Sequence, residues 1–200
     1  MATLGQAKTL GGVGSILVLL GFVPYAGFVL GIVGFILILI AVKYISEVIG
    51  DPAVFNNMII AVVLAIVGLV VGGVVVFGAI YSLVGLGSLG TSGTISGGVL
   101  GLIAAIIIGL VVIWIFYLIA SIFIKKSYDT IANRINVGTF HTDGLLYLIG
   151  AALTIIFVGL IIVLIAEILQ IVAFFSIPEQ MPMGPQPMPG QMGPPPPGTR

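Results

Sequence analysis

The chain has 200 residues, of which 60% are apolar and 6% are charged, with six basic and six acidic side chains. Ordinary globular proteins carry about 25% charged residues, so this chain cannot cover a water-facing surface. With a mean hydropathy of +1.38, the composition excludes a soluble enzyme and a nucleic-acid binder with a basic face. The lack of cysteine excludes disulfides and thiolate metal sites. The sequence predicts a non-enzymatic protein of the lipid bilayer without a cofactor.

Five apolar stretches are long enough to cross a membrane, because a spanning helix needs about 20 mostly apolar residues. They predict an all-α, polytopic transmembrane helical bundle over residues 4–23, 27–46, 56–81, 97–124 and 145–175. Pro24 and Gly27 are expected to form the turn between the first two helices. Asp51 is expected to cap the third helix, and Pro52 suits its first position.

The fifth stretch, 145–175, is longer than a bilayer requires, so it must tilt, project or bend near Gly159. Asp143 or Thr142 is the expected cap of this helix. A single crossing would place the C-terminus opposite the N-terminus. A re-entrant segment would instead return the C-terminus to the starting side.

The basic residues predict the orientation. One side of the predicted five-span arrangement carries five of the six basic residues, namely Lys8, Lys43, Lys125, Lys126 and Arg134. The Pro24 turn and the 82–98 loop on the other side carry none. Cytoplasmic loops are enriched in Lys and Arg. We therefore expect a multi-pass protein of the cell membrane with a cytoplasmic N-terminus and, for a single fifth crossing, an external tail.

The segment 125–143 is expected to form a cytoplasmic basic loop carrying Lys125, Lys126 and Arg134. Its apolar residues recur at helical spacing, which predicts either an interfacial amphipathic helix or a projecting last turn of the fourth span, ending at 136–138. These apolar residues are Tyr128, Ile131, Ala132 and Ile135. The segment is also a candidate docking site for a protein partner.

Two features could bind a metal, and each has a simpler interpretation. His141 and Asp143 are potential ligands, but without a third ligand nearby they are more typical of a helix cap and an interfacial histidine. The segment 178–200 holds nine of the 11 prolines and predicts a disordered Pro/Met-rich tail that could meet a partner. Its thioethers could gather Cu(I), or they could be low-complexity composition: Met181, Met183, Met188 and Met192.

Glycine accounts for 29 residues, and much of it lies within the predicted spans at small-xxx-small spacing. In lipid, helices associate through close backbone approach and dispersion rather than through a hydrophobic force. We therefore predict helix-packing contacts, within one chain or between copies in a homo-oligomer, at Gly27, Gly31, Gly68, Gly72, Gly97, Gly101, Ala105 and Gly109.

Glu167 is the one acidic residue within the predicted spans, and Gln170 follows one helical turn later. Ionisable groups at membrane depth mark ion and proton pathways in transporters. Glu167 and Gln170 are therefore the candidate intramembrane polar site. The alternative is a wetted interfacial carboxylate or a plain helix contact.

Two passages resemble a known family. One runs from QAKTLGG (6–12) through FVPYAG (22–27) to IAVKYIS (40–46), and the other from YLIGAALTI (147–155) through Gly159 to AFFSIP (173–178). The chain resembles the mainly archaeal integral-membrane family catalogued as domain of unknown function 996. This resemblance covers nearly everything before the tail and implies a multi-span membrane protein of archaeal origin. It implies no functional residues, because the family has no established activity.

These observations favour a structural or accessory role, in which the bundle anchors the protein and the loop and tail meet partners. The alternative is a small channel or transporter component with Glu167 in or near the pathway.

Overall fold

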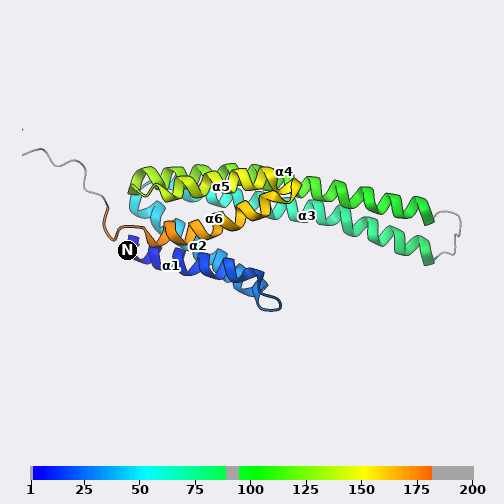
Figure 1. The fold of residues 1–200 in the computed structure, drawn as a ribbon, viewed down its shortest axis with the longest axis horizontal. Helices are drawn as coiled ribbons and strands as arrows, with labels where there is room; N and C mark the ends of the chain where they lie inside the picture. Colours follow the sequence, from blue (N-terminus) through cyan, green and yellow to red (C-terminus); the bar gives the residue numbers. More distant parts are fainter. Residues whose placement is uncertain (1, 89–94, 182–200) are drawn as a thin grey trace, which may run out of the picture.

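The computed structural model describes residues 2–88 and 95–181, and within these ranges the chain is helical with no strand (Figure 1). This confirms the predicted all-α bundle. Two short 3-10 turns, η1 and η2, interrupt the helices. The elements are α1 Leu4–Leu19, η1 Leu20–Phe22, α2 Gly27–Ile49, α3 Pro52–Ser88, α4 Ile95–Ile135, α5 Thr139–Leu153, η2 Thr154–Ile156 and α6 Val158–Phe175.

The described helices pair into three antiparallel hairpins, α1–α2, α3–α4 and α5–α6, whose tips point the same way (Figure 1). The α3–α4 hairpin is the longest and projects beyond the other two. At the opposite end lie the N-terminus, the α2–α3 and α4–α5 turns and the end of α6. The basic residues of α1, α2 and α4 lie towards this end, which we call the basic end.

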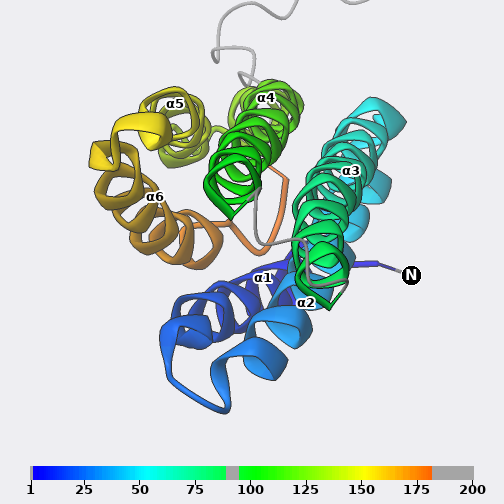
Figure 2. The same cartoon turned by 90° about the vertical axis from the view of Figure 1, so that its right-hand side faces the viewer.

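Seen along its length, the bundle is a closed ring (Figure 2). Each helix packs on the next in chain order, and α6 packs on α1 to complete the circle. The centre of the bundle is therefore enclosed by all six described helices, and it is the one place where a polar group can be kept from lipid on every side.

The second helices of the three hairpins bury equivalent positions. Each presents a small residue, a second small residue two turns later, and an isoleucine one turn after that, all buried. The three sets are Gly34, Ala41 and Ile45 in α2; Ala120, Ser127 and Ile131 in α4; and Ala166, Ala173 and Ile177 in α6 and just beyond it. The second helices of the three hairpins thus share one spacing of buried positions.

The fifth predicted span is two helices rather than one. The chain turns at η2 and at Phe157, whose φ of 63° is left-handed. Gly159 makes the reversal possible, since a Cβ there would lie 2.1 Å from the carbonyl oxygen of Gly150. A single crossing by 145–175 is therefore wrong: α6 folds back along α5 and ends beside α1, where a Cβ at Gly11 would meet the ring of Phe174.

Six described helices run along the bundle, one more than the five predicted spans. Five of the described helices are long and apolar enough to cross a membrane, and they are α2 to α6. Helix α1, with 16 residues, is shorter. The predicted fifth span supplies two of the five.

The starts of α1 at Leu4, of α2 at Gly27 and of α3 agree with the sequence, whereas the end of α3 and the start of α5 differ. Asp51 accepts a hydrogen bond from the Ala53 amide at 3.0 Å and Pro52 begins α3, as predicted. The predicted cap at Asp143 or Thr142 is wrong, because α5 begins at Thr139 with Gly138 at the cap position. Residues 82–88, expected in a loop, extend α3.

Some predictions concern residues that lie partly or wholly outside the described ranges. Residues 89–94 of the expected external loop lie outside the described residues. So do residues 182–200 of the predicted tail, with three of the four candidate copper ligands, Met183, Met188 and Met192.

Several of the predicted packing glycines lie where backbones approach within one chain. A Cβ at Gly27 would lie 2.2 Å from the Gly21 oxygen, and Gly31 lies close to the same residue. A Cβ at Gly68 would lie 2.4 Å from Phe116 Cβ, and Gly72 and Gly109 face each other between α3 and α4.

The predicted row of small residues from Gly97 to Gly109 does not pack against α3 along its whole length. A Cβ at Gly101 would meet nothing within 4 Å in the described part of the chain. A four-residue spacing drifts by about 40° per step on a helix of 3.6 residues per turn, so Gly101 has rotated away from the line of Gly109. Ala105 is half-buried between them, and the surroundings of Gly97 are outside the description.

Substitution of two adjacent glycines tests the α3–α4 contact. Gly72→Ala should destabilise the bundle by about 1–3 kcal/mol through overpacking, because the new Cβ would lie 2.5 Å from Ile113 Cγ1 and 2.7 Å from the Gly109 oxygen. Gly73→Ala meets nothing within 4 Å and should be neutral or slightly stabilising. Thermal unfolding in detergent measures both, and equal effects would contradict the contact.

Candidate functional site

A cluster of buried polar side chains lies inside the ring. The Tyr147 hydroxyl of α5 donates a hydrogen bond to Glu167 Oε1 of α6 at 2.5 Å. Gln170 Nε2 of α6 donates to the Tyr128 hydroxyl oxygen of α4. Glu167 is 9% exposed and Gln170 3%. The structure thus brings together the two candidate polar residues predicted from the sequence and joins each to a tyrosine; we call these four residues the polar cluster.

The fold-back of α6 creates this arrangement. Tyr147 and Glu167 lie equally far along the chain on either side of Phe157, so the antiparallel hairpin sets them opposite each other. Gln170 follows Glu167 by one turn and stays on the same face. The α4–α5 turn then brings Tyr128 to the other side of Gln170.

The polar cluster forms one wall of a cavity of about 210 Å³ that is lined by residues of all six helices. Tyr117 of α4 extends the polar wall. The remaining walls are apolar and include Val18 of α1, Phe35 and Ile38 of α2, and Val62 and Ala65 of α3. The lining of the cavity thus combines polar and aromatic side chains of α4, α5 and α6 with apolar side chains of α1, α2 and α3.

Two oxygens of the polar wall have no hydrogen-bond partner among the described residues: Glu167 Oε2 and Gln170 Oε1. Buried polar atoms are nearly always satisfied, since an unsatisfied one costs about 1–3 kcal/mol. Both oxygens are acceptors when the carboxyl is ionised, so the site is prepared for a ligand that donates hydrogen bonds.

A second buried acid lies next to the cluster. Asp143 is fully buried on α5, one turn before Tyr147, and neither of its carboxyl oxygens has a partner among the described residues. A buried acid costs free energy unless it is neutral, hydrogen-bonded or paired with a cation, so two neighbouring acids strengthen the preference of this region for positive charge.

An apolar groove adjoins the cavity. It lies between α2 and α3, has a volume of about 500 Å³ and shares Phe35, Val62 and Ala65 with the cavity. Its other lining residues are apolar, among them Phe28 and Leu69. The cavity is thus bordered by a lateral, apolar approach.

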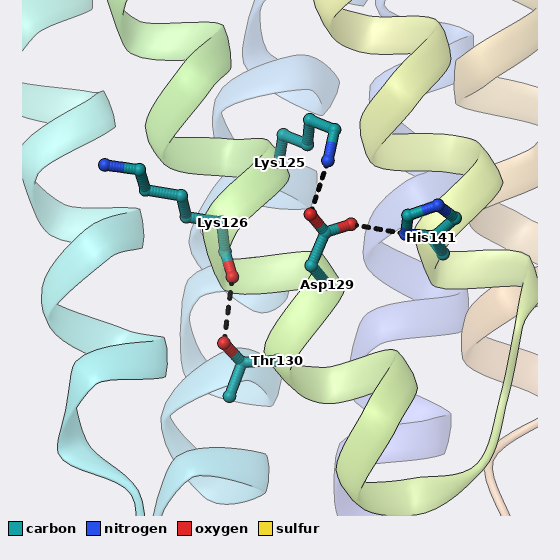
Figure 3. A network of polar contacts seen from close by, with 5 residues as sticks. All are labelled: Lys125, Lys126, Asp129, Thr130 and His141. Atoms are coloured by element: carbon teal, nitrogen blue, oxygen red, sulfur yellow. Dashed lines mark hydrogen bonds and ion pairs between the residues drawn. The ribbon is translucent and has the colours of Figure 1, made fainter.

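The second polar group lies at the basic end (Figure 3). Asp129 accepts from Lys125 Nζ at 2.5 Å and contacts His141 Nδ1 at 2.7 Å. The Thr130 hydroxyl donates to the Lys126 carbonyl oxygen at 3.0 Å. These side chains are partly exposed, where ion pairs contribute at most about 1 kcal/mol. The described residues contain no group of three or more His, Asp or Glu able to hold a metal.

The predicted basic loop is the last part of α4 rather than a loop. Of the two alternatives for 125–135, the structure has the projecting end of the fourth span, and α4 ends at Ile135. Arg134 lies 3.7 Å from Asp51 Oδ2 at the α2–α3 turn, and Lys126 Nζ lies 5.2 Å from the centre of the Phe123 ring.

The sequence did not identify three residues of this region. Tyr128 fits an apolar helical pattern, and Asp143 fits a cap. Asp143 and Tyr147 are four residues apart and Glu167 and Gln170 are three apart, so each pair lies on one face of its helix. This spacing was the available signal, but the two pairs can be recognised as neighbours only once the turn at Phe157 is known.

Comparison with known proteins gives two matches. The family model described as "Protein of unknown function (DUF996)" matches residues 30–168, which include Tyr128, Asp143, Tyr147 and Glu167. The chain is also 36% identical over 179 residues to "Uncharacterized protein MJ1644" of Methanocaldococcus jannaschii, covering 89% of this chain and 95% of that protein. No solved structure matches significantly.

Asp143→Ala tests whether the second acid is a cost to the fold. The substitution puts an alanine in α5, and the bundle already buries alanine in its helices, for example Ala7 in α1. Removing unpartnered carboxyl oxygens should offset about 1–3 kcal/mol, so the unfolding temperature should rise or stay unchanged despite the lost volume. Asp129→Ala is the control and should lower stability slightly by removing its contacts with Lys125 and His141. A large loss of stability in Asp143→Ala alone would show that Asp143 has a structural partner.

Proposed function

Because this chain belongs to the DUF996 family, whose function is unknown, we propose its role from its own geometry. It is a non-enzymatic, multi-pass membrane protein that binds a small cation inside the helical ring, as a component of a transport system. One observation carries this proposal: Glu167 and Gln170 line the central cavity and each keeps a buried oxygen without a partner.

A purely structural bundle would gain little from these residues. Ionisable side chains at membrane depth are costly and are typical of pathways for ions and substrates. At the positions with the same spacing, α2 has Phe35 and Ile38 and α4 has Ser121 and Ile124, so this spacing of buried residues does not require an acid. The transport interpretation therefore takes precedence over the accessory role favoured by the sequence alone.

We also propose that the N-terminus and the end of α6 both face the cytoplasm. Lys8, Lys43, Lys125, Lys126 and Arg134 lie towards the same end as the N-terminus, and a cytoplasmic excess of basic residues sets membrane orientation. Because α6 returns to this end, the segment that follows it begins there too. This orientation replaces the external tail expected from a single fifth crossing.

The cation site is tested by the unfolding temperature of the purified protein in detergent, measured with added sodium, potassium and methylammonium chloride at constant ionic strength. A bound cation stabilises the folded state, by about 2.7 kcal/mol at a hundredfold excess over its Kd. At least one cation should raise the unfolding temperature of the unchanged protein, and Glu167→Gln should abolish that rise.

Glu47→Gln is the matched control, because Glu47 is an exposed acid of α2 paired only with Lys43 at 3.8 Å. It should leave the cation effect unchanged. If no cation stabilises the unchanged protein, or if Glu167→Gln responds as the unchanged protein does, the cavity does not bind a cation.

Protease access to terminal tags tests the orientation. Tags at the N- and C-termini should both resist protease added to intact cells and should both be digested after permeabilisation. Digestion of the C-terminal tag in intact cells would place the two ends on opposite sides of the membrane.

A further inference from the structure

The lining of the cavity indicates which cation it takes. Glu167 and Gln170 each keep one buried acceptor oxygen without a partner among the described residues, and Tyr117, Tyr128 and Tyr147 also line the cavity. Carboxylates and aromatic rings together are favourable for ammonium groups, which bind through hydrogen bonds and cation–π contacts.

The donor set is poor for a metal. Ca²⁺ takes 6–8 oxygen ligands and Mg²⁺ demands near-ideal octahedral geometry, whereas the unpartnered oxygens on this wall are one of Glu167 and one of Gln170. A primary ammonium group carries three N–H donors and needs no closed coordination shell.

Apolar side chains make up most of the remaining lining. Phe35 and Ile38 of α2 and Val62 and Ala65 of α3 are among them. The volume of about 210 Å³ lies below the roughly 300–1,000 Å³ of pockets for drug-sized molecules. The ligand is therefore small and has an apolar part that these side chains can cover.

The groove between α2 and α3 supplies a route for such a ligand. It meets the cavity at Phe35, Val62 and Ala65 and is lined by apolar residues. Many of these side chains, including Phe28, Ile36 and Leu69, are exposed on the lipid-facing surface of the hairpins. A molecule that dissolves in the membrane by an apolar tail can reach the cavity from the side.

We propose that the cavity binds a small aliphatic amine in its ammonium form, which enters between α2 and α3. Its nitrogen donates hydrogen bonds to Glu167 and Gln170, and its alkyl chain packs on Phe35 and Ile38. This inference rests on the proposed cation site and specifies its ligand.

Isothermal titration calorimetry on the full chain in nanodiscs tests this assignment, with empty nanodiscs as the reference for partitioning into lipid. The probes are butylammonium chloride, methylammonium chloride, 1-butanol, sodium chloride and calcium chloride. Butylammonium should bind about tenfold or more tightly than methylammonium, because each buried methylene favours binding. Butanol, which lacks the charge, should not bind measurably.

Two kinds of variant test the charged end and the alkyl end of the ligand separately. Glu167→Gln should abolish the binding of both ammonium probes. Phe35→Ala should weaken butylammonium by about tenfold and leave methylammonium unchanged, and Ile38→Ala tests the same wall independently. Phe77→Ala is the control, since Phe77 is 73% exposed on α3 and does not line the cavity or the groove.

The remaining outcomes overturn the inference in distinguishable ways. If sodium or calcium binds in a Glu167-dependent manner and butylammonium is no tighter than methylammonium, the cation site stands but its ligand is inorganic. If Phe35→Ala and Ile38→Ala leave butylammonium binding unchanged, the alkyl chain does not lie on this wall. If none of the cations binds, the inference and the proposed function both fail.

Discussion

In a membrane, every polar group must find its partner inside the protein, because lipid offers none. The turn between α5 and α6 interrupts the regular hydrogen bonding of the helices, so polar groups there need partners from elsewhere in the protein. The Trp114 indole of α4 donates to the Ala151 carbonyl oxygen at 2.9 Å, and the Thr154 hydroxyl donates to the Gly150 oxygen at 2.7 Å. The Trp114 bond fastens the end of α5 to α4, and the Thr154 bond stabilises the α5–α6 turn itself.

The closed ring explains why the acidic side chain of Glu167 can be buried among the helices. Once α6 packs on α1, Glu167 faces the bundle interior and a tyrosine instead of lipid. Hydrogen bonds in such a low-dielectric interior are strong, and an incompletely satisfied network is costly. The positions of α2 with the same spacing as Glu167 and Gln170 carry apolar side chains, Phe35 and Ile38. The polar lining of the cavity thus comes from α4, α5 and α6.

The sequence was sufficient for what periodicity and composition control. It predicted apolar helices, the turn at Pro24 and the start of α3 at Pro52, and it singled out Glu167 and Gln170 as a polar pair. It was insufficient for the α5–α6 reversal, because no proline marks it: Phe157 adopts a left-handed conformation that its residue type disfavours, and only the close approach of Gly150 and Gly159 accommodates it. Since Tyr147, Asp143 and Tyr128 join the site through that reversal, they could not be assigned beforehand.

Cross-linking between α1 and α6 measures ring closure most directly. The chain has no cysteine, so Gly12→Cys with Phe175→Cys introduces a clean pair at positions in contact, where a Cβ at 12 would lie 2.5 Å from the Phe175 ring. A short bifunctional thiol reagent should join the pair within one chain in native membranes, whereas Val74→Cys with Phe175→Cys should stay unlinked. If 12 and 175 fail to react with each other while each accepts a monofunctional label, α6 does not return to α1 and the site cannot form.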